Sequence, residues 1–250
     1  MTLRRALATA CALVLLSSVS ACGSDDPGGQ GEKLTVLAAA SLTDVFEELA
    51  EDFEGEQGVE VEFSFGSSTD LAEQAAEGAP GDVLATADEA SMQIAEDASV
   101  TREGVSFATN VLVIVTPPDN PAGIESLDDL ADATWVRCAD AVPCGRAALG
   151  VLEANGSTAE PASLEEDVRA TLDKVISGEA DAGLVYATDA VAAGDDVATI
   201  EIPRAEEQLT SYFAAALEQA HDAELAQEWV ELLLSDRGQQ ALTDAGFELS

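Results

Sequence analysis

The chain has 250 residues, of which 47% are hydrophobic and 4% are aromatic. Ten lysines and arginines stand against 49 aspartates and glutamates, so the formal net charge at pH 7 is −39. This charge argues against nucleic acid and anionic lipid as electrostatic partners, because both require a basic protein face. Such acidity is common in disordered chains, but the hydrophobic content and its periodicity predict a folded body of one large domain or two smaller ones.

The N-terminal residues 1–21 have the pattern of an export signal. A pair of arginines precedes a short apolar run over residues 6–19, which is too short to span a bilayer. The run ends in Val-Ser-Ala-Cys, which resembles a bacterial lipobox, so cleavage before Cys22 and lipidation of that cysteine are expected. Ordinary signal-peptidase cleavage beside an incidental cysteine is the alternative. Residues 22–32 then form a flexible polar tether that holds the body near the outer face of the membrane.

Strand and helix patterns alternate through the first half of the body. Short apolar or alternating runs predict strands, and apolar residues at helical spacing predict helices. The predicted strands cover residues 33–39, 59–65, 82–87 and 111–115, and the predicted helices cover 43–55, 68–77 and 90–97.

The alternation continues to the C-terminus. Strands are predicted at residues 134–138, 182–186 and 197–202, and helices at 127–131, 146–154, 163–177 and 222–234, with a further segment at 235–246. The helix over 163–177 is expected to start at Ser163, because Ser163 and Glu166 have the spacing of a capping box. The whole pattern predicts an α/β fold with mostly parallel strands.

Two cysteines, Cys138 and Cys144, remain for the folded body and lie six positions apart around a proline-containing turn. In an exported protein this spacing favours a local disulfide, and two free thiols are the alternative. Because the loop is short, the bridge is expected to shape the turn more than to stabilise the fold. Two cysteines and one histidine fall short of a zinc set, so no metal site with side-chain ligands is predicted.

Two serines lie where a strand pattern gives way to a helix pattern. Ser41 and Ser68 each offer a hydroxyl and free backbone N–H groups at an expected helix N-terminus, which is a means of holding an oxyanion. Both serines are also expected to cap their helices. Ala87 and Tyr186 end further strands, and ligands of open α/β sheets bind beyond such strand ends. A tyrosine in the core is the alternative for Tyr186.

The sequence offers little to an enzyme. His221 is the only histidine and lies in an acidic helical stretch, so a Ser-His-Asp hydrolase would depend on it alone. Neither a Gly-x-Ser-x-Gly elbow nor a P-loop is present, and a carboxylate pair can always be proposed among 49 acids. A binding protein is therefore predicted, with a secreted hydrolase as the alternative class.

Five ordered segments carry a resemblance to a known family. They are AASLTDVFEELA at 39–50, FGSSTDLAEQAAEGAPGDVLATAD at 65–88, VPCGRAAL at 142–149, SLEEDVRATLDKVISGEADAGLVYATDA at 163–190 and GQQALTDAGF at 238–247. Together they make the chain similar to the molybdate-binding proteins of bacterial ABC importers over nearly all of its body. The resemblance implies the type-II periplasmic-binding-protein fold, in which two α/β lobes are joined by a two-strand hinge.

By this resemblance, lobe 1 comprises residues 33–112 plus 204–250 and lobe 2 comprises residues 113–203. The hinge strands would lie near residues 111–116 and 197–203.

The resemblance also implies a ligand site between the lobes. The family's hydroxyl ligands correspond to Ser41, Ser68 and Tyr186, and its backbone N–H ligands correspond to Cys144 and Val168. Ala87 lies beside the site and is a weaker candidate. A cysteine at 144 replaces a small residue of some relatives, which a contact through backbone N–H tolerates.

The chemistry of these residues suits molybdate or tungstate, which at neutral pH are tetrahedral dianions that only accept hydrogen bonds. Phosphate keeps a proton and would need an acceptor, which these positions lack. The resemblance therefore implies a monomeric, lipid-anchored, extracytoplasmic protein that needs no cofactor and delivers molybdate or tungstate to a membrane permease. Sulfate or another oxyanion is the alternative ligand, and cavity size would decide between them.

Overall fold

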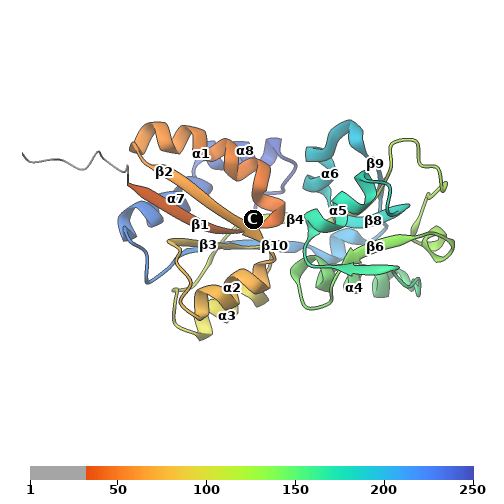
Figure 1. Cartoon of the computed structure of the whole chain (residues 1–250), viewed down its shortest axis with the longest axis horizontal. Coiled ribbons are helices and arrows are strands. Elements are labelled where there is room, and N and C mark those ends of the chain that lie inside the picture. The colour runs from red at the N-terminus through yellow and green to blue at the C-terminus, as the bar shows by residue number, and fades with distance from the viewer. Residues whose placement is uncertain (1–31) are drawn as a thin grey trace, which may run out of the picture. The chain divides into compact units, whose positions relative to one another are not determined.

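Residues 32–250 are described here by a computed structural model of the chain. The predicted export signal, Cys22 and the tether up to residue 31 lie outside the described residues. The described part folds into two lobes, each built on a five-stranded sheet with helices on both faces (Figure 1). Within it, no helix combines the length and the apolar character that crossing a membrane requires.

Lobe 1 is built on a sheet with the strand order β2-β1-β3-β10-β4. Its strands are β1 (Lys33–Ala39), β2 (Glu60–Gly66), β3 (Val83–Thr86), β4 (Val105–Asn110) and β10 (Thr210–Ala216). β1 pairs in parallel with β2 and β3, whereas β10 runs antiparallel to β3 and β4. Four of the five strands therefore run in one direction, as expected for a mixed, mostly parallel sheet.

Helices cover both faces of the lobe 1 sheet (Figure 1). One face carries η1 (Ala40–Leu42), α1 (Thr43–Gln57), α7 (Ala223–Leu234) and α8 (Asp236–Asp244), and the other carries α2 (Ser68–Ala76) and α3 (Glu89–Asp97). Neighbouring residues of a strand point to opposite faces. Val36 and Val83 accordingly join the core under α1 and α7, whereas Leu37 and Leu84 join the core under α2 and α3. Burial on both faces explains the nearly continuous apolar runs of β1 and β3.

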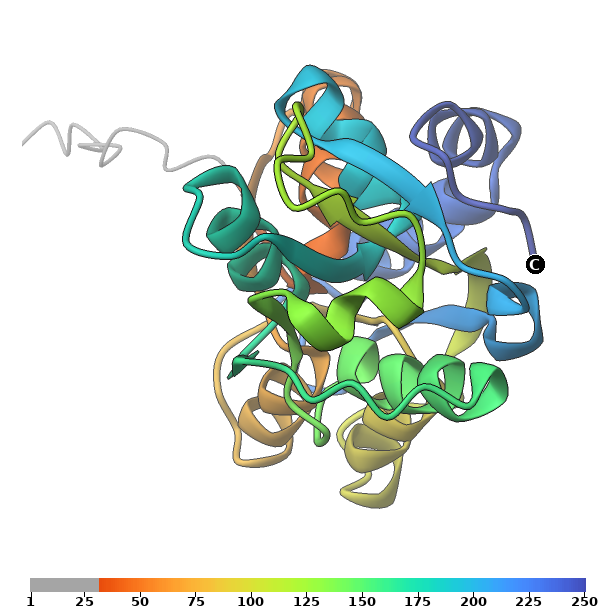
Figure 2. The same cartoon turned by 90° about the vertical axis from the view of Figure 1, so that its right-hand side faces the viewer.

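Lobe 2 repeats this arrangement with the strand order β7-β6-β8-β5-β9. Its strands are β5 (Leu112–Thr116), β6 (Trp135–Cys138), β7 (Ser163–Glu165), β8 (Ala182–Tyr186) and β9 (Ala198–Glu201). β6 pairs in parallel with β7 and β8, and β5 runs antiparallel to β8 and β9. Its helices are α4 (Pro143–Asn155), α5 (Val168–Ile176) and α6 (Ala187–Ala193), with short 3-10 turns η2 (Leu127–Asp132) and η3 (Gly194–Asp196). Figure 2 views this lobe from outside, with α4 on one side of the sheet.

The chain passes between the lobes twice. The first crossing is the single residue Val111 between β4 and β5, and the second follows β9 through η4 (Ala205–Gln208) into β10. β5 and β9 pair with each other, so both crossings leave lobe 2 from adjacent strands. Two adjacent crossing strands are a common basis for hinge motion between lobes.

Three features of the fold differ from the sequence predictions. Helix α6, which directly follows β8, was not predicted. The helix expected to begin at Ser163 begins at Val168, because residues 163–165 instead pair with β6 as the parallel strand β7. The strands β4 and β10 were not predicted. Both are rich in alanine, serine and threonine, so their strand conformation depends on pairing with each other and with β3 rather than on a strong local pattern.

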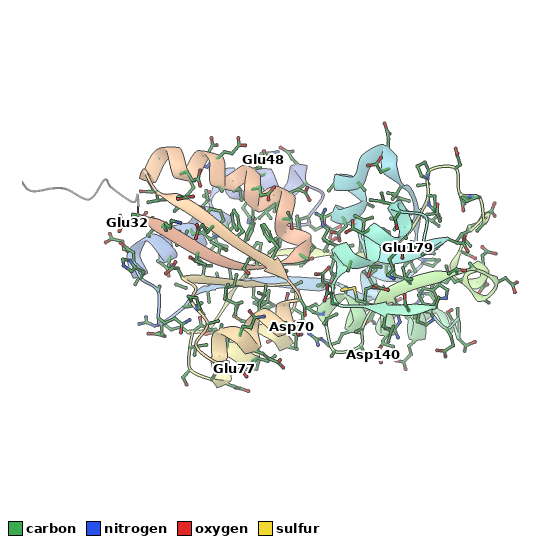
Figure 3. All side chains as sticks on the ribbon, viewed as in Figure 1. Glu32, Glu48, Asp70, Glu77, Asp140 and Glu179 are labelled. Carbon is green, nitrogen blue, oxygen red and sulfur yellow. A yellow bond between two sulfur atoms is a disulfide. The ribbon has the colours of Figure 1, made fainter. Side chains whose placement is uncertain are left out.

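Most acidic side chains lie on the outer surface of the described part, with Asp82 and Asp189 as buried exceptions. Glu48, Asp70, Glu77, Asp140 and Glu179 are all exposed and point away from the sheets (Figure 3). The negative charge is thus spread over solvated faces of both lobes, whereas the sheets and the inner helix faces supply the apolar cores.

Candidate functional site

A small pocket of ≈ 20 Å³ lies between the two lobes. A cavity needs about 10–15 Å³ to hold one water, so this pocket suits a single small solute and not a sugar or peptide. All six residues that were proposed for the ligand site line it: Ser41, Ser68 and Ala87 from lobe 1, and Cys144, Val168 and Tyr186 from lobe 2. A larger hollow of ≈ 370 Å³ lies on lobe 1 alone and contains none of the six.

The pocket collects the starts of helices from both lobes. Ser41 lies in η1, directly after β1, and Ser68 is the first residue of α2. Cys144 and Val168 lie in the first turns of α4 and α5, and Tyr186 directly precedes α6. The first N–H groups of a helix lack an intrahelical acceptor, and the helix dipole adds partial positive charge at the same end. Several such ends around one pocket form an environment for an anion.

The hydroxyl of Ser68 does not cap its helix, contrary to expectation. Ser67 is the N-cap of α2, and its Oγ accepts the N–H of Asp70 at 3.4 Å. Ser68 follows it as the first helical residue and is 2% exposed. Its Oγ accepts the backbone N–H of Ala87 at 3.0 Å. Because this bond occupies an acceptor position of Oγ, the hydroxyl proton of Ser68 remains available to a ligand.

The hydroxyl of Ser41 does not cap a helix either. The N-cap position of η1 belongs to Ala39, and no side chain caps that turn. Instead, Oγ of Ser41 lies 2.8 Å from Oη of Tyr212, a fully buried residue of β10. Sequence reasoning missed Tyr212, which lies 171 positions further along the chain.

The N-terminus of α4 is held by the disulfide. Cys138, the last residue of β6, is bonded to Cys144, with the Cα atoms 5.7 Å apart (yellow bond in Figure 3). The first intrahelical hydrogen bond runs from the N–H of Arg146 to the carbonyl of Val142, so the N–H of Cys144 lies ahead of it. Gly145 is required beside it, because a Cβ there would lie 1.7 Å from the carbonyl oxygen of Ala139.

The N-terminus of α5 presents the N–H of Val168. Asp167 is the N-cap, and its Oδ1 accepts the N–H of Ala170 at 2.9 Å. Asp167 also lines the pocket, where it is the one charged residue. Its Oδ1 is engaged by the backbone of the helix. The rest of the lining consists of hydroxyls, backbone groups and small apolar side chains.

Tyr186 brings a buried phenol to the pocket. The residue is 1% exposed, and its Oη has no hydrogen-bond partner among residues 32–250. Burial raises the pKa of the phenol above its ordinary value, so the group remains a neutral donor. A buried polar atom without a partner is costly in free energy, and a bound anion would satisfy it.

Two ion pairs join the lobes beside the pocket, and sequence analysis predicted neither. Arg146 of α4 approaches Asp88 with Nε at 2.7 Å from Oδ2. Arg169 of α5 pairs with Asp44 of α1 and also lies 3.0 Å from the buried Asp189 of its own lobe. Each arginine lies close in sequence to a residue whose backbone N–H was proposed as a ligand. Arg146 follows Cys144, and Arg169 follows Val168.

The hydrolase alternative gains no support from the geometry. His221 is exposed at the surface of lobe 1 and does not line the pocket. Its backbone N–H donates to Asp82, which explains its place in the turn before α7. In residues 32–250 no group of three or more His, Cys, Asp or Glu side chains is arranged to hold a metal ion.

Two sheet-based lobes, crossed twice by the chain and enclosing a small pocket, define a two-lobed solute-binding protein. Residues 34–248 match the family described as bacterial extracellular solute-binding protein, and the chain belongs to this family.

Relatives and solved structures agree with this assignment. The molybdate-binding protein ModA of Mycobacterium tuberculosis is 37% identical over 245 residues, which cover 94% of each chain. The periplasmic molybdate-binding protein of Azotobacter vinelandii matches the fold with a TM-score of 0.78 at 22% identity, over 87% of this chain and 99% of that one. The sulfate-binding protein SubI of Mycobacterium tuberculosis matches with a TM-score of 0.73 at 19% identity, over 86% of each chain. The predicted two-lobed periplasmic-binding-protein fold is thus confirmed, and the family description indicates an extracytoplasmic protein.

Proposed function

We propose that the protein is the solute-binding component of an ABC importer for molybdate or tungstate. The observation that carries this proposal is the donor set of the pocket between the lobes, formed by two serine hydroxyls, one tyrosine hydroxyl and the first N–H groups of α4 and α5. The 37% identity to a molybdate-binding protein supports the choice of ligand. The role is binding and delivery, without catalysis and without a cofactor.

A site of neutral donors matches a fully deprotonated tetrahedral dianion. Molybdate, tungstate and sulfate accept hydrogen bonds and donate none at neutral pH, so each pocket donor finds an acceptor. Phosphate retains a proton, and the one side-chain carboxylate in the lining, Asp167, already accepts the N–H of Ala170 through Oδ1, so phosphate is matched less well than a dianion and should bind more weakly. Sulfate has the same charge and the same hydrogen-bonding needs as molybdate, so discrimination between them falls to the size of the cavity.

The two lobes supply the capture step. The proposed ligands come from both, so the anion completes the site only when the lobes close around it. We propose that the closed protein, a monomer attached to the membrane through a lipid on Cys22, presents the anion to its permease. The pocket lies close to many carboxylates, but salt screens distant charges over about 8–10 Å, so the local donors dominate at the site.

Titration calorimetry on the purified protein tests the proposal. Molybdate and tungstate should bind tightly, sulfate at least about tenfold more weakly, and phosphate without measurable heat. Absence of heat with every one of the four anions would refute the proposal. Tightest binding of sulfate would assign the alternative ligand.

Serine variants test whether the pocket is the site. Ser41→Ala combined with Ser68→Ala should weaken molybdate binding by about 1–3 kcal/mol for each lost buried donor. Ser177→Ala is the matched control, because Ser177 is exposed at the end of α5 and does not line the pocket. Equal affinity in the double variant and the control would place the anion elsewhere.

A further inference from the structure

A line of buried polar groups leads from lobe 2 to the Ser41 hydroxyl. The amide nitrogen of Asn110 lies 2.8 Å from Oγ1 of Thr188 and 3.4 Å from Oη of Tyr212, and Oη of Tyr212 lies 2.8 Å from Oγ of Ser41. Each of the four residues is at most 4% exposed. Of the four, only Ser41 lines the pocket, so the other three act behind it.

The direction of each hydrogen bond in this line follows from Asn110. Its Oδ1 accepts the backbone N–H of Val111 at 3.0 Å, which fixes the amide and turns its NH2 group toward the two hydroxyls. An amide NH2 only donates. Oη of Tyr212 therefore accepts from Asn110, and its single proton is left for Oγ of Ser41.

Ser41 is thereby fixed as a donor toward the pocket. Its Oγ accepts the proton of Tyr212, and its own proton is free to point at a ligand. Burial holds the pKa of Tyr212 well above the ordinary value, so the phenol keeps the proton that this arrangement requires. Ser68 is fixed in the same sense, but by the backbone N–H of Ala87.

We propose that Tyr212 is a positioning residue that orients the Ser41 hydroxyl as a hydrogen-bond donor to the ligand and so helps the site favour fully deprotonated oxyanions over protonated ones such as phosphate. This inference rests on the proposed function. A serine without this partner could turn both lone pairs of its Oγ toward the proton of hydrogen phosphate, whereas the bond from Tyr212 occupies one lone pair and leaves the serine proton directed at the ligand. Tyr212 would then contribute to specificity without touching the ligand.

Tyr212→Phe is the variant that isolates the hydroxyl. The ring of Tyr212 packs edge-on against Phe107, Tyr186 and Phe247, with centroid distances of 6.2, 6.0 and 5.1 Å, and phenylalanine keeps these contacts. Asn110 keeps Thr188 as its partner in the variant. The substitution therefore removes one hydroxyl from the line and leaves the packing in place.

Calorimetry with molybdate and phosphate should show two effects of Tyr212→Phe. Molybdate should bind about 5- to 20-fold more weakly, and the ratio of phosphate to molybdate affinity, with phosphate measured by its competition against molybdate, should rise by about that factor. In a Ser41→Ala background, Tyr212→Phe should leave molybdate affinity unchanged, because its effect acts through Ser41. Thr101→Val is the control, since it removes a buried hydroxyl of lobe 1 outside the pocket.

The outcomes separate the two proposals. Suppose that the parent protein binds molybdate. The role of Tyr212 alone would then be overturned if Tyr212→Phe caused the same loss of affinity with and without Ser41→Ala, or if it left the ratio of phosphate to molybdate affinity unchanged. Failure of the parent to bind any oxyanion would overturn the proposed function and this role with it.

Discussion

Replacing Asp88 with asparagine should weaken anion binding by about 5- to 30-fold, because it removes an ion pair that joins the two lobes beside the pocket. Asp88 belongs to lobe 1 and Arg146 to lobe 2, and two guanidinium nitrogens lie 2.7 and 2.6 Å from one carboxylate oxygen. Oδ1 of Asp88 also caps α3 by accepting the N–H of Ser91, and asparagine can form the same cap through its side-chain oxygen.

The magnitude follows from the exposure of the pair. A hydrogen bond to a charged group contributes about 1.5–3 kcal/mol when buried, and the Arg146 and Asp88 side chains are 34% and 20% exposed, so about 1–2 kcal/mol is expected. The second interlobe pair is more exposed, with Asp44 at 57%, and Asp44→Asn should lower affinity by only about 1.5- to 5-fold. Free energy lost from the closed state lowers the apparent affinity of any ligand that requires closure.

The sign of the effect distinguishes this mechanism from simple electrostatics. Removing a carboxylate near an anion site would strengthen anion binding if through-space repulsion dominated. Loss of a closing contact predicts the opposite, and mainly a faster release of the anion. Asp88→Asn therefore tests the mechanism by the direction of the change as well as by its size.

Stopped-flow and calorimetric measurements with molybdate provide the assay. Glu56→Gln is the matched control, because this substitution also removes one negative charge. Glu56 pairs with Arg237 at 2.6 and 3.0 Å, and both residues belong to lobe 1. Unchanged or tighter binding in Asp88→Asn, or an equal loss in the control, would refute the closing role of the ion pairs.

Two further predictions concern lobe 2. Replacing both Cys138 and Cys144 by serine should lower the free energy of unfolding by no more than about 2 kcal/mol, because the closed loop is short, and should weaken molybdate binding, because the N–H of Cys144 loses its anchor. Urea denaturation and calorimetry measure the two effects, and an unchanged affinity would contradict the anchoring role. Burial raises the pKa of Asp189 to about 7, above the value in an unfolded chain, despite the neighbouring Arg169. The folded state then holds a proton that the unfolded state releases, so this residue stabilises the fold below about pH 4 and that contribution is lost as the pH rises to 7, with a slope of at most about 1.4 kcal/mol per pH unit. Asp189→Asn should remove this part of the slope in pH-dependent urea denaturation, and an identical slope in the variant would show that Asp189 does not titrate in this range.

The strong local patterns of the sequence predicted most of the fold. The apolar runs of β1 and β8 and the helical spacing in α1 need no distant partner to be recognised, and the structure places them within two residues of the predicted bounds. Ser163 shows where local reasoning fails. A capping-box spacing is weak evidence when a neighbouring strand, here β6, can pair with the same residues.

The candidate site divides in the same way. Sequence patterns show where a strand gives way to a helix, and this is where Ser41, Ser68 and Tyr186 lie. The family resemblance added Cys144 and Val168. Tyr212 and the interlobe arginines could not be predicted in this manner, because their importance depends on contacts between residues 58 to 171 positions apart. Only the folded arrangement of the two lobes brings those partners together.

The arrangement of charge explains how an acidic protein can hold a dianion. The lining of the pocket contains no lysine, arginine or histidine, and the two arginines beside it are each engaged by a carboxylate of the opposite lobe. Free cations at the site would attract any anion, including phosphate and chloride, and would give little selectivity. Neutral donors instead bind an anion tightly only when its acceptors match them in number and direction. In the proposed function the arginines would serve closure, while hydroxyls and helix N-termini would serve recognition, so the two tasks would fall on different residues that can be changed one at a time.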